Sequence, residues 1–513
     1  MPSFTAVVAT GGRPGASDGQ PALREGRIRN TGKSVPAAME KHVTGSEPPT
    51  VADPIRQARG RDLTARPTSE LAEFCSALTY DDIPPEVRDR VKGIILDTVA
   101  SAIAGRRGDE TGQIEALAGA IGGAPRATVL AGPRMSLAGA ALLNGHQATA
   151  VALCDIHRPT QCHITPAVIP PALAIAEDRR LGGRAFLTAV TAGLEVVVRV
   201  GTGMRYPAMR ARGWHSPGVI GPFGGAAAGA SLMGLDPTRF RNALSLAGTQ
   251  AAGTFAQWGT PTIRFHQSRA AYSGLLAALL AETGFKASPD VLTADHGGLF
   301  NLYSDGGDAE ATVAGLGTEW TLRTISLRPW PAAAGIQTLI TSLFALIDAH
   351  DLHPDAIETV EVGLSKTVHD MHGTQPWDTR PGALLSAPYV TGVVLHDRRC
   401  WFEQVAPERI ASPDLDAFIR SRVSVAVDGA VAGPGAAVTV RMRDGRVFED
   451  RRAHPRGDAA DPLGRADIQE KFRMCSEGLI DPGAADAAIA LIERLEELDD
   501  MARLAGLLGQ PAK

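Results

Sequence analysis

The segment PPEVRDRVKGIILDTVASAIAG, residues 84–105, carries the start and stop signals of one helix. Prolines stand at its beginning, where a helix needs no amide donor, and a glycine stands at its end. Its apolar residues recur at helical spacing, as they do in the preceding segment TSELAEFCSAL, residues 68–78. That preceding segment also has a Ser/Thr cap ahead of Glu70. We therefore expect the folded part of the chain to begin with two helices.

Helical patterns continue along the chain from there. In residues 183–200 the apolar side chains recur at steps of four, four and three, which is the period of a helix face. Residues 482–508 carry a similar apolar stripe, and we expect them to pack back on the first helices. We assign residues 66–322 to an all-helical domain that helices within 465–508 complete. Its other expected helices are 134–150, 170–179, 222–233, 237–252 and 267–283.

Strand signals occur only in the later part of the chain. IETVEVGL (357–364) and RVSVAVD (422–428) alternate apolar and polar residues. AAVTVRMRDGRVFED (436–450) contains two such runs around Asp444-Gly445, which is the signature of a hairpin. Residues 323–464 are therefore expected to form a smaller α+β domain. The predicted fold class is mainly α, with a large all-helical domain and this smaller domain.

Size and composition fit a globular protein with more than one core. The chain has 513 residues, of which 44% are hydrophobic and 21% charged, and a single core rarely spans so many residues. The formal net charge of -5 gives no electrostatic argument for nucleic acid or an anionic membrane as a partner. The longest uncharged run, residues 218–235, is mostly Gly and Ala, so we expect no membrane span.

The cysteines indicate the cellular compartment, and the composition of the N-terminal residues indicates that they are disordered. Five cysteines, an odd and sparse set, argue against a disulfide framework and favour a reducing compartment. We therefore expect a cytoplasmic protein. Residues 1–60 are rich in Gly, Pro, Ser and Thr without apolar periodicity, so we expect a disordered N-terminal extension.

The decapeptide CDIHRPTQCH, residues 154–163, concentrates groups that bind metals or transfer protons. Structural zinc sites usually pair their ligands as C-x2-C or H-x3-5-H, whereas the spacing here is C-x2-H and C-H, and adjacent Cys162 and His163 can hardly face one ion. We therefore expect no metal. An acid/base centre needs only an imidazole and a carboxylate that orients it, and Asp155, His157 and His163 supply both. For each histidine, a plain structural role in the loop stays open.

Two further polar clusters stand before helices rich in small residues. GWHSPGVIGPFGG contains His215 ahead of a Pro/Gly turn, and its small side chains let another backbone approach closely. TIRFHQSRAAYSG, residues 262–274, contains Arg264, His266 and Arg269. Arginine forks suit di- or tricarboxylates. Each arginine alone could equally form a structural ion pair.

Taken in order, these segments resemble the MmgE/PrpD family, which includes 2-methylcitrate dehydratase, cis-aconitate decarboxylase and an iminodisuccinate epimerase. The resemblance implies that the smaller domain is a lid, that the site lies between the domains and needs neither cofactor nor metal, and that the protein is a homodimer. The matching pieces are LDTVASAIAG (96–105), ALLNGHQATAVALCDIHRPTQCHITPAVIPPALAIAE (141–177), GLEVVVRVG (193–201), GWHSPGVIGPFGGAAAGASLMGLD (213–236), IRFHQSRAAYSGLLAALLAETGF (263–285), SLRPWPAAAG (326–335) and HPRGDAADPLGRADIQEKFR (454–473).

The resemblance also suggests roles for individual residues. His163 and His215 match histidines of the family's H-P-S and G-x-H stretches, and we expect both to transfer protons. Asp155 and His157 match the end of its D-D-T-H stretch and join them as candidate catalytic residues. Thr165 and the amides after it are expected to hold a substrate carboxylate. The remaining expected substrate-binding residues are Arg264, His266, Arg269 and Arg328.

The chain departs from the family at several of these positions. Ala152 stands where an upstream acid is usual, and Cys154 replaces another carboxylate. Ile263 begins the stretch I-R-F-H where many members have K-R-x-H, so a substrate-binding lysine is missing. Arg328 stands where the decarboxylase has lysine, and Ala333 where it has histidine. These changes argue against cis-aconitate or 2-methylcitrate, but the arginines keep the positive charge that a carboxylated substrate needs.

We therefore expect a lyase, either a dehydratase or a decarboxylase, that acts on a small di- or tricarboxylic acid by histidine-mediated proton transfer. An epimerase or isomerase of a carboxylated substrate is the alternative, because the same groups can remove and return a proton. A catalytically silent ligand-binding paralogue is a third possibility, because the lysine and the acids are missing. The sequence does not decide among these.

Overall fold

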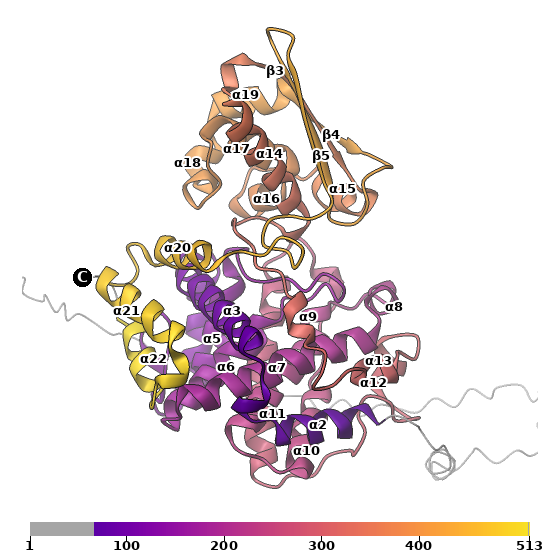
Figure 1. Ribbon diagram of the computed structural model, residues 1–513, viewed down its shortest axis with the longest axis vertical. Helices are drawn as coiled ribbons and strands as arrows, with labels where there is room; N and C mark the ends of the chain where they lie inside the picture. Colours follow the sequence, from indigo (N-terminus) through magenta and orange to yellow (C-terminus); the bar gives the residue numbers. More distant parts are fainter. Residues whose placement is uncertain (1–65, 511, 513) are drawn as a thin grey trace, which may run out of the picture. The chain divides into compact units, whose positions relative to one another are not determined.

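The computed structural model describes residues 66–510 and 512, which belong to one unit of the chain, Pro54–Lys513. The expected disorder of residues 1–60 lies outside the described residues. Within them, helices dominate and strands are few, which confirms the mainly α fold class (Figure 1). Two large hydrophobic cores form: one among the helices that precede residue 328 and follow residue 462, and one among residues 332–442.

Helices build the first of these two regions. Short strands β1 (Ala127–Thr128) and β2 (Arg134–Met135) pair antiparallel beside them. Helix α20 (Arg465–Ser476) packs against α3, and α21 (Pro482–Glu493) and α22 (Ala502–Leu508) pack against α3 and α6, so the C-terminal end returns to the first helices. The preceding helices are α2 (Pro67–Ala77), α3 (Pro85–Ala104), α4 (Thr111–Ile121), α5 (Leu137–Ala150), α6 (Thr165–Asp178), α7 (Gly183–Met204), α8 (Tyr206–Ala211), α9 (Ser216–Leu232), α10 (Pro237–Gly248), α11 (Thr262–Glu282), α12 (Leu299–Tyr303) and α13 (Ala309–Val313).

Helices α9 and α11 cross with their backbones nearly in contact. A Cβ atom added at Gly274 of α11 would lie only 2.7 Å from the Cα of Gly225 and 2.8 Å from the amide nitrogen of Ala226 on α9. Real Cβ atoms essentially never come this close to backbone, so glycine is required at the crossing. The expectation that small side chains let another backbone approach is confirmed. This contact fixes how the residues at the start of each helix face one another.

Three helices begin earlier than the sequence pattern suggests: α11, expected at 267–283, begins at Thr262, and the other two contain interior prolines. The expected helix 170–179 begins at Thr165 and contains Pro170 and Pro171 in its interior. The expected helix 222–233 begins at Ser216 and contains Pro222. An interior proline removes a helix hydrogen bond, so these prolines favoured later starts. Buried neighbours hold both helices despite this loss, and as a result His163 and His215 lie directly ahead of helix N-termini.

Residues 332–452 form the smaller region, in which helices cover a four-stranded sheet of order β4-β3-β5-β6. Strand β4 (Val423–Val427) is parallel to β3 (Ile357–Leu364). Strands β5 (Ala436–Met442) and β6 (Val447–Arg452) form the predicted hairpin, and Gly445 in its turn has a φ of 88°. The helices of this region are α14 (Gln337–His350), α15 (Lys366–His372), α16 (Arg380–Leu385), α17 (Ala387–Asp397), α18 (Pro407–Ile410) and α19 (Pro413–Arg422).

Among the described residues, α7 is long and apolar enough to pass a test for membrane spans by length and composition. Of its most apolar window, 89% is buried inside the protein. It has the setting of a core helix, in contact with α9, α6 and α13.

Candidate active site

The loop between α5 and α6 is organised around the carboxylate of Asp155. This carboxylate is fully buried and accepts hydrogen bonds from the amides of Ile164 (2.9 Å) and Thr165 (3.1 Å) and from the Thr165 hydroxyl (2.7 Å). Burial raises the pKa of Asp155, while the nearby His163 and these hydrogen bonds act to lower it. Asp155 therefore holds the start of α6. Thr165, expected to bind a substrate carboxylate, has both donors engaged with Asp155, and this contact does not support the expected role.

His163 is held so that one ring nitrogen stays free. Its Nδ1 lies 2.5 Å from the carbonyl oxygen of Asp155, and because a carbonyl only accepts, Nδ1 carries the proton. No hydrogen bond joins Nε2 to any residue of 66–510 or 512. Burial, together with the positive charge of Arg328, lowers the pKa of His163 to about 4. Near neutral pH this imidazole is uncharged, with an available lone pair on Nε2, as a general base requires.

His157, six positions earlier, has the opposite environment. Its Nδ1 lies 2.8 Å from the Thr160 hydroxyl and its Nε2 lies 3.0 Å from the Thr324 hydroxyl. Backbone hydrogen bonds with Cys162 close the turn around it. Burial lowers the pKa of His157 to about 4. Because both ring nitrogens are engaged with the protein, these contacts favour a structural role over the expected catalytic one.

His215 and His266 form a hydrogen-bonded pair. His215 is the residue before α9, His266 lies on α11, and their Nδ1 atoms are 2.8 Å apart, so one of the two carries the shared proton. Burial is the main cause that lowers the pKa of His215 well below its ordinary value, followed by His266, His163 and Arg210. The loop that carries His163 is tied to the same place, because the Ser216 hydroxyl donates to the carbonyl of Thr160 at 2.7 Å. The structure thus brings His163, His215 and His266 together.

A row of aromatic side chains extends from this histidine pair to the smaller region. Phe255 meets the ring of His215 edge-on and stacks on Trp258, with ring centroids 6.0 and 5.2 Å apart. Trp258 in turn meets His372 of α15. The Nδ1 of His372 lies 2.9 Å from the carbonyl oxygen of Leu385, and burial lowers its pKa to about 4. Sequence patterns did not single out Phe255 or Trp258, since aromatic residues between helices carry no periodic signal, nor His372 at the end of α15.

Arg328 is buried beside the His163 loop, and its guanidinium is engaged with the protein. It donates to the carbonyl of Cys154 through Nε, to the carbonyl of Ala332 at 3.0 Å, and to the Cys154 sulfur at 3.2 Å. It therefore contributes positive charge near His163 while most of its donors face the backbone. A direct bond from Arg328 to substrate stays a prediction.

The segment that carries Arg328 is fastened by a buried ion pair that the sequence did not reveal. Lys471 of α20 donates to Asp97 of α3 at 2.6 Å, and both side chains are almost fully buried. The same ammonium group donates to the carbonyls of Leu153 and Arg328 at 3.0 and 2.8 Å. The ammonium group of Lys471 thus joins helices α3 and α20 to the two chain segments beside the site, which contain Leu153 and Arg328. Its partners lie between 143 and 374 positions away, so no local pattern predicts them.

The two arginines expected on α11 differ in their contacts. Arg269 donates to the carbonyls of Gln250 (2.7 Å), Gly218 (3.0 Å) and Ala252 (2.7 Å), which makes it a clamp for the backbone beside His266. This use of its donors argues against the expected role in substrate binding. Arg264 instead pairs with Glu110 at 2.6 Å and lines a cavity.

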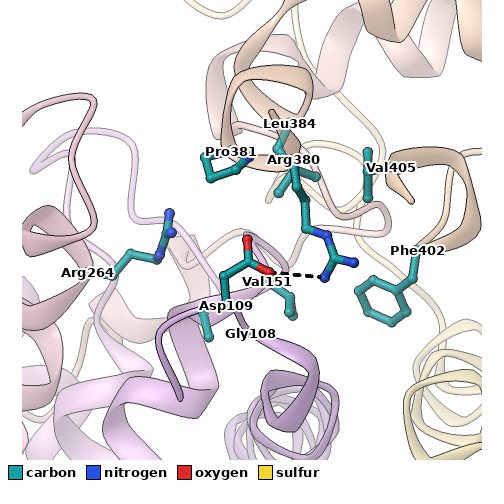
Figure 2. A pocket seen from close by; sticks show the side chains of 10 residues that line it. Gly108, Asp109, Val151, Arg264, Arg380, Pro381, Leu384, Phe402 and Val405 are labelled. Atoms are coloured by element: carbon teal, nitrogen blue, oxygen red, sulfur yellow. Dashed lines mark ion pairs between the residues drawn. The ribbon is translucent and has the colours of Figure 1, made fainter. Parts of the chain in front are cut away.

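That cavity lies where α11 approaches α16 of the smaller region (Figure 2). Arg264 lines it from one side and Arg380 from the other, with Asp109 between them, as Figure 2 shows. Val151, just ahead of the His163 loop, and Phe402 form part of its apolar wall. A second hollow continues from it and shares Asp109, Arg264 and Arg380, but is also lined by Trp258. Trp258 thus belongs both to the aromatic row and to the wall of this second hollow.

The two cysteines of the His163 loop are buried thiols. Burial raises the pKa of the Cys154 thiol, and that of Cys162 lies well above its ordinary value for the same reason. Without a bound metal ion, both thiols therefore stay protonated. Within the part of the chain that the structure describes, no group of three His, Cys, Asp or Glu side chains is placed to hold a metal ion.

Comparison with known proteins finds relatives along most of the chain. Residues 69–312 match the MmgE/PrpD N-terminal domain, and residues 330–497 match the MmgE/PrpD C-terminal domain. The chain is 28% identical over 480 residues to a cis-aconitate decarboxylase-like protein of Aspergillus oryzae, covering 86% of this chain and 97% of that protein. It is 27% identical over 490 residues to the cis-aconitate decarboxylase of Aspergillus terreus (89% and 99% covered). It is 24% identical over 467 residues to that of Homo sapiens (87% and 95% covered).

Proposed function

Because this chain belongs to the MmgE/PrpD family, we propose that it is a lyase that acts on a small di- or tricarboxylic acid through proton transfer by His163 and the His215–His266 pair. The relatives named cis-aconitate decarboxylase support chemistry at a carbon beside a carboxylate. The observation that carries the proposal is the free Nε2 of a neutral His163 next to the hydrogen-bonded histidine pair.

In a dehydration, Nε2 of His163 takes the proton from the carbon beside a carboxylate. The electron pair of that C–H bond forms the new double bond while the C–O bond of the hydroxyl breaks. The N–H of the His215–His266 pair supplies the proton with which the hydroxyl leaves as water. In a decarboxylation, carbon dioxide leaves, the electron pair of the broken C–C bond stays on carbon, and a protonated histidine delivers a proton there.

The bound substrate itself is needed to charge these histidines. In the empty site, burial lowers the pKa of His163, His215 and His266, so all three are neutral near pH 7. A polycarboxylate adds negative charge within the site and raises the pKa of nearby imidazoles. Binding therefore favours uptake of a proton by one histidine, which makes an acid available only when substrate is present.

The test is turnover of a panel of di- and tricarboxylic acids in heavy water, followed by NMR. We expect loss of water or carbon dioxide from at least one acid, with deuterium on the carbon that is protonated. The panel includes cis-aconitate, although the chain lacks the lysine and acid that the family places at Ile263 and Ala152. Binding of acids without conversion or deuterium exchange would contradict the proposal and support a silent paralogue.

An epimerase is the second candidate, because the free Nε2 of His163 and the His215–His266 pair come from different elements. Two such groups can remove a proton from one face of a carbon and return one to the other. Deuterium incorporation with inversion and no net loss of water or carbon dioxide would establish this reaction instead. Assembly as a homodimer, which the family resemblance implies, stays a prediction.

A further inference from the structure

The guanidinium groups of Arg264 and Arg380 face one cavity from different regions of the molecule. Arg264 belongs to α11, and Arg380 is the first residue of α16. Figure 2 shows Asp109 between the two side chains, with an ion pair drawn from Arg380 to Asp109, whereas Arg264 pairs with Glu110. Arginine forks suit carboxylates, and here a ligand would compete with Asp109 and Glu110 for the two guanidinium groups.

Neither arginine uses all of its N–H donors in hydrogen bonds within the protein. Arg380 donates to the carbonyl of Arg107 at 3.1 Å, and its Nη1 is 3.6 Å from Asp109, which is too long for a hydrogen bond. Arg264 donates once to Glu110, while its Nε is buried without a partner among the described residues. A guanidinium offers five N–H donors, so each has several left over. The Nε of Arg264 is buried, and buried donors are usually satisfied in native proteins, so this donor is open to a ligand or a water molecule.

The cavity itself is small, about 20 Å³, but the adjoining hollow that shares Arg264 and Arg380 has a volume of about 560 Å³ and can hold a carbon skeleton. Val151, Leu384 and Phe402 supply apolar surface beside the arginines. The adjoining hollow leads past Arg264 and Arg380 to Trp258, which joins the aromatic row ending at His215. A ligand whose carboxylate lies between the arginines can therefore extend its other carbons along Trp258, although His163, His215 and His266 do not themselves line either hollow.

We propose that Arg380 and Arg264 together bind one carboxylate of the substrate, and that Asp109 takes the place of this carboxylate in the empty cavity. This inference rests on the proposed function, since it assumes a polycarboxylate substrate. Asp109 is half-exposed, so it can turn to solvent when the ligand enters. Arg380 then serves as a substrate-binding residue contributed by the lid region.

The test measures binding of tricarballylate, a saturated tricarboxylate, by calorimetry to the full chain. We expect Arg380→Gln and Arg264→Gln each to raise Kd about tenfold or more, as the loss of charge-assisted hydrogen bonds predicts. Asp109→Asn should lower Kd or leave it within about twofold, because it removes a competing carboxylate. The matched control is Arg441→Gln, since Arg441 pairs with Glu361 at a similar 3.5 Å on the sheet, outside the cavity.

Three results would overturn the inference: no binding of tricarballylate to the wild type, unchanged Kd in Arg380→Gln, or an increase in Kd for Asp109→Asn as large as for Arg380→Gln. The last is the outcome for a purely structural ion pair. If Arg380→Gln does not fold, Arg380→Lys, which keeps the charge but loses the fork, should still raise Kd about threefold or more. Turnover distinguishes the two proposals, because binding that depends on Arg380 in a protein without lyase activity would refute only the proposed function.

Discussion

The loop Val151–Ile164 and the cavity around Arg264 and Arg380 both line the boundary with the smaller region, yet their polar groups are satisfied to different degrees. In the loop, Asp155 accepts hydrogen bonds from both partners at the start of α6, and His157 uses both ring nitrogens. In the cavity, the Nε of Arg264 and the Oε2 of Glu110 are buried without partners among the described residues. The hydrogen bonds of the loop hold the chain in place, whereas the cavity keeps one donor and one acceptor that a ligand could use. His163, with one nitrogen bound and one free, combines the two conditions.

The largest effect is expected for His163→Gln. The free Nε2 of His163 is the proposed general base. The turnover rate should therefore fall about 100-fold to 10,000-fold, the usual contribution of a general base. The free energy of unfolding should change little, since Gln keeps a donor for the Asp155 carbonyl. Product formation by NMR and urea unfolding measure the two quantities. A variant with the wild-type rate would remove His163 from the mechanism.

Lys471→Met should cause the largest loss of stability. It leaves the Asp97 carboxylate buried without its partner, and breaking a buried pair in this way typically costs about 3–5 kcal/mol. Urea unfolding monitored by circular dichroism gives the change in free energy. The control is Arg473→Met, two positions along α20, whose ion pair with Asp486 is exposed. Equal losses in both variants would show that burial of the Lys471 pair is unimportant.

His157→Gln tests whether His157 has a structural role and His163 the catalytic one. Because both ring nitrogens are bound to threonine hydroxyls, replacing the ring should lower the free energy of unfolding by about 1–3 kcal/mol. Turnover in the folded fraction should change far less than in His163→Gln. A loss of turnover as large as for His163→Gln, with stability unchanged, would reverse the assignment.

The smallest effect is a change in how stability depends on pH. The pKa of His157 is about 4 in the folded protein and near 6.5 when unfolded, so between these values the unfolded chain binds the extra proton. Stability therefore falls as pH drops from about 6.5 toward 4, with a slope near 1.4 kcal/mol per pH unit for this one group. Urea unfolding at pH 5 and pH 7 should show a smaller difference in His157→Gln than in the wild type. The same difference in both proteins would contradict the pKa shift.

Much of the fold follows from local patterns, and the site follows only in part. The helix at 84–105 and the hairpin at Asp444-Gly445 carry complete start, stop and turn signals, and the structure confirms both. The starts of α6 and α9 were placed too late, because interior prolines usually end a helix and here do not. Burial by neighbouring helices compensates for the lost hydrogen bonds, and that burial is not visible in local sequence.

For the site, the sequence singled out His163, His215 and His266, and the structure brings them together. The resemblance favoured His163 for proton transfer but kept His157 as a candidate catalytic residue, since the contact that engages Nε2 of His157 comes from a distant segment, Thr324. Arg380 and Lys471 were missed because their partners lie far away along the chain. Local patterns identify residue types that can do chemistry, while long-range contacts decide which of them are free to do it.

The crossing of α9 and α11 at Gly225 and Gly274 has a consequence for how this chemistry could change during evolution. With no side chain between the two backbones, the spacing of the helices sets the 2.8 Å contact of His215 with His266. A single added methyl group at position 274 would overlap the backbone of α9, and any shift of the helices that relieved this overlap would also move His215 relative to His266. The geometry of the pair thus depends on a core position that carries no functional group.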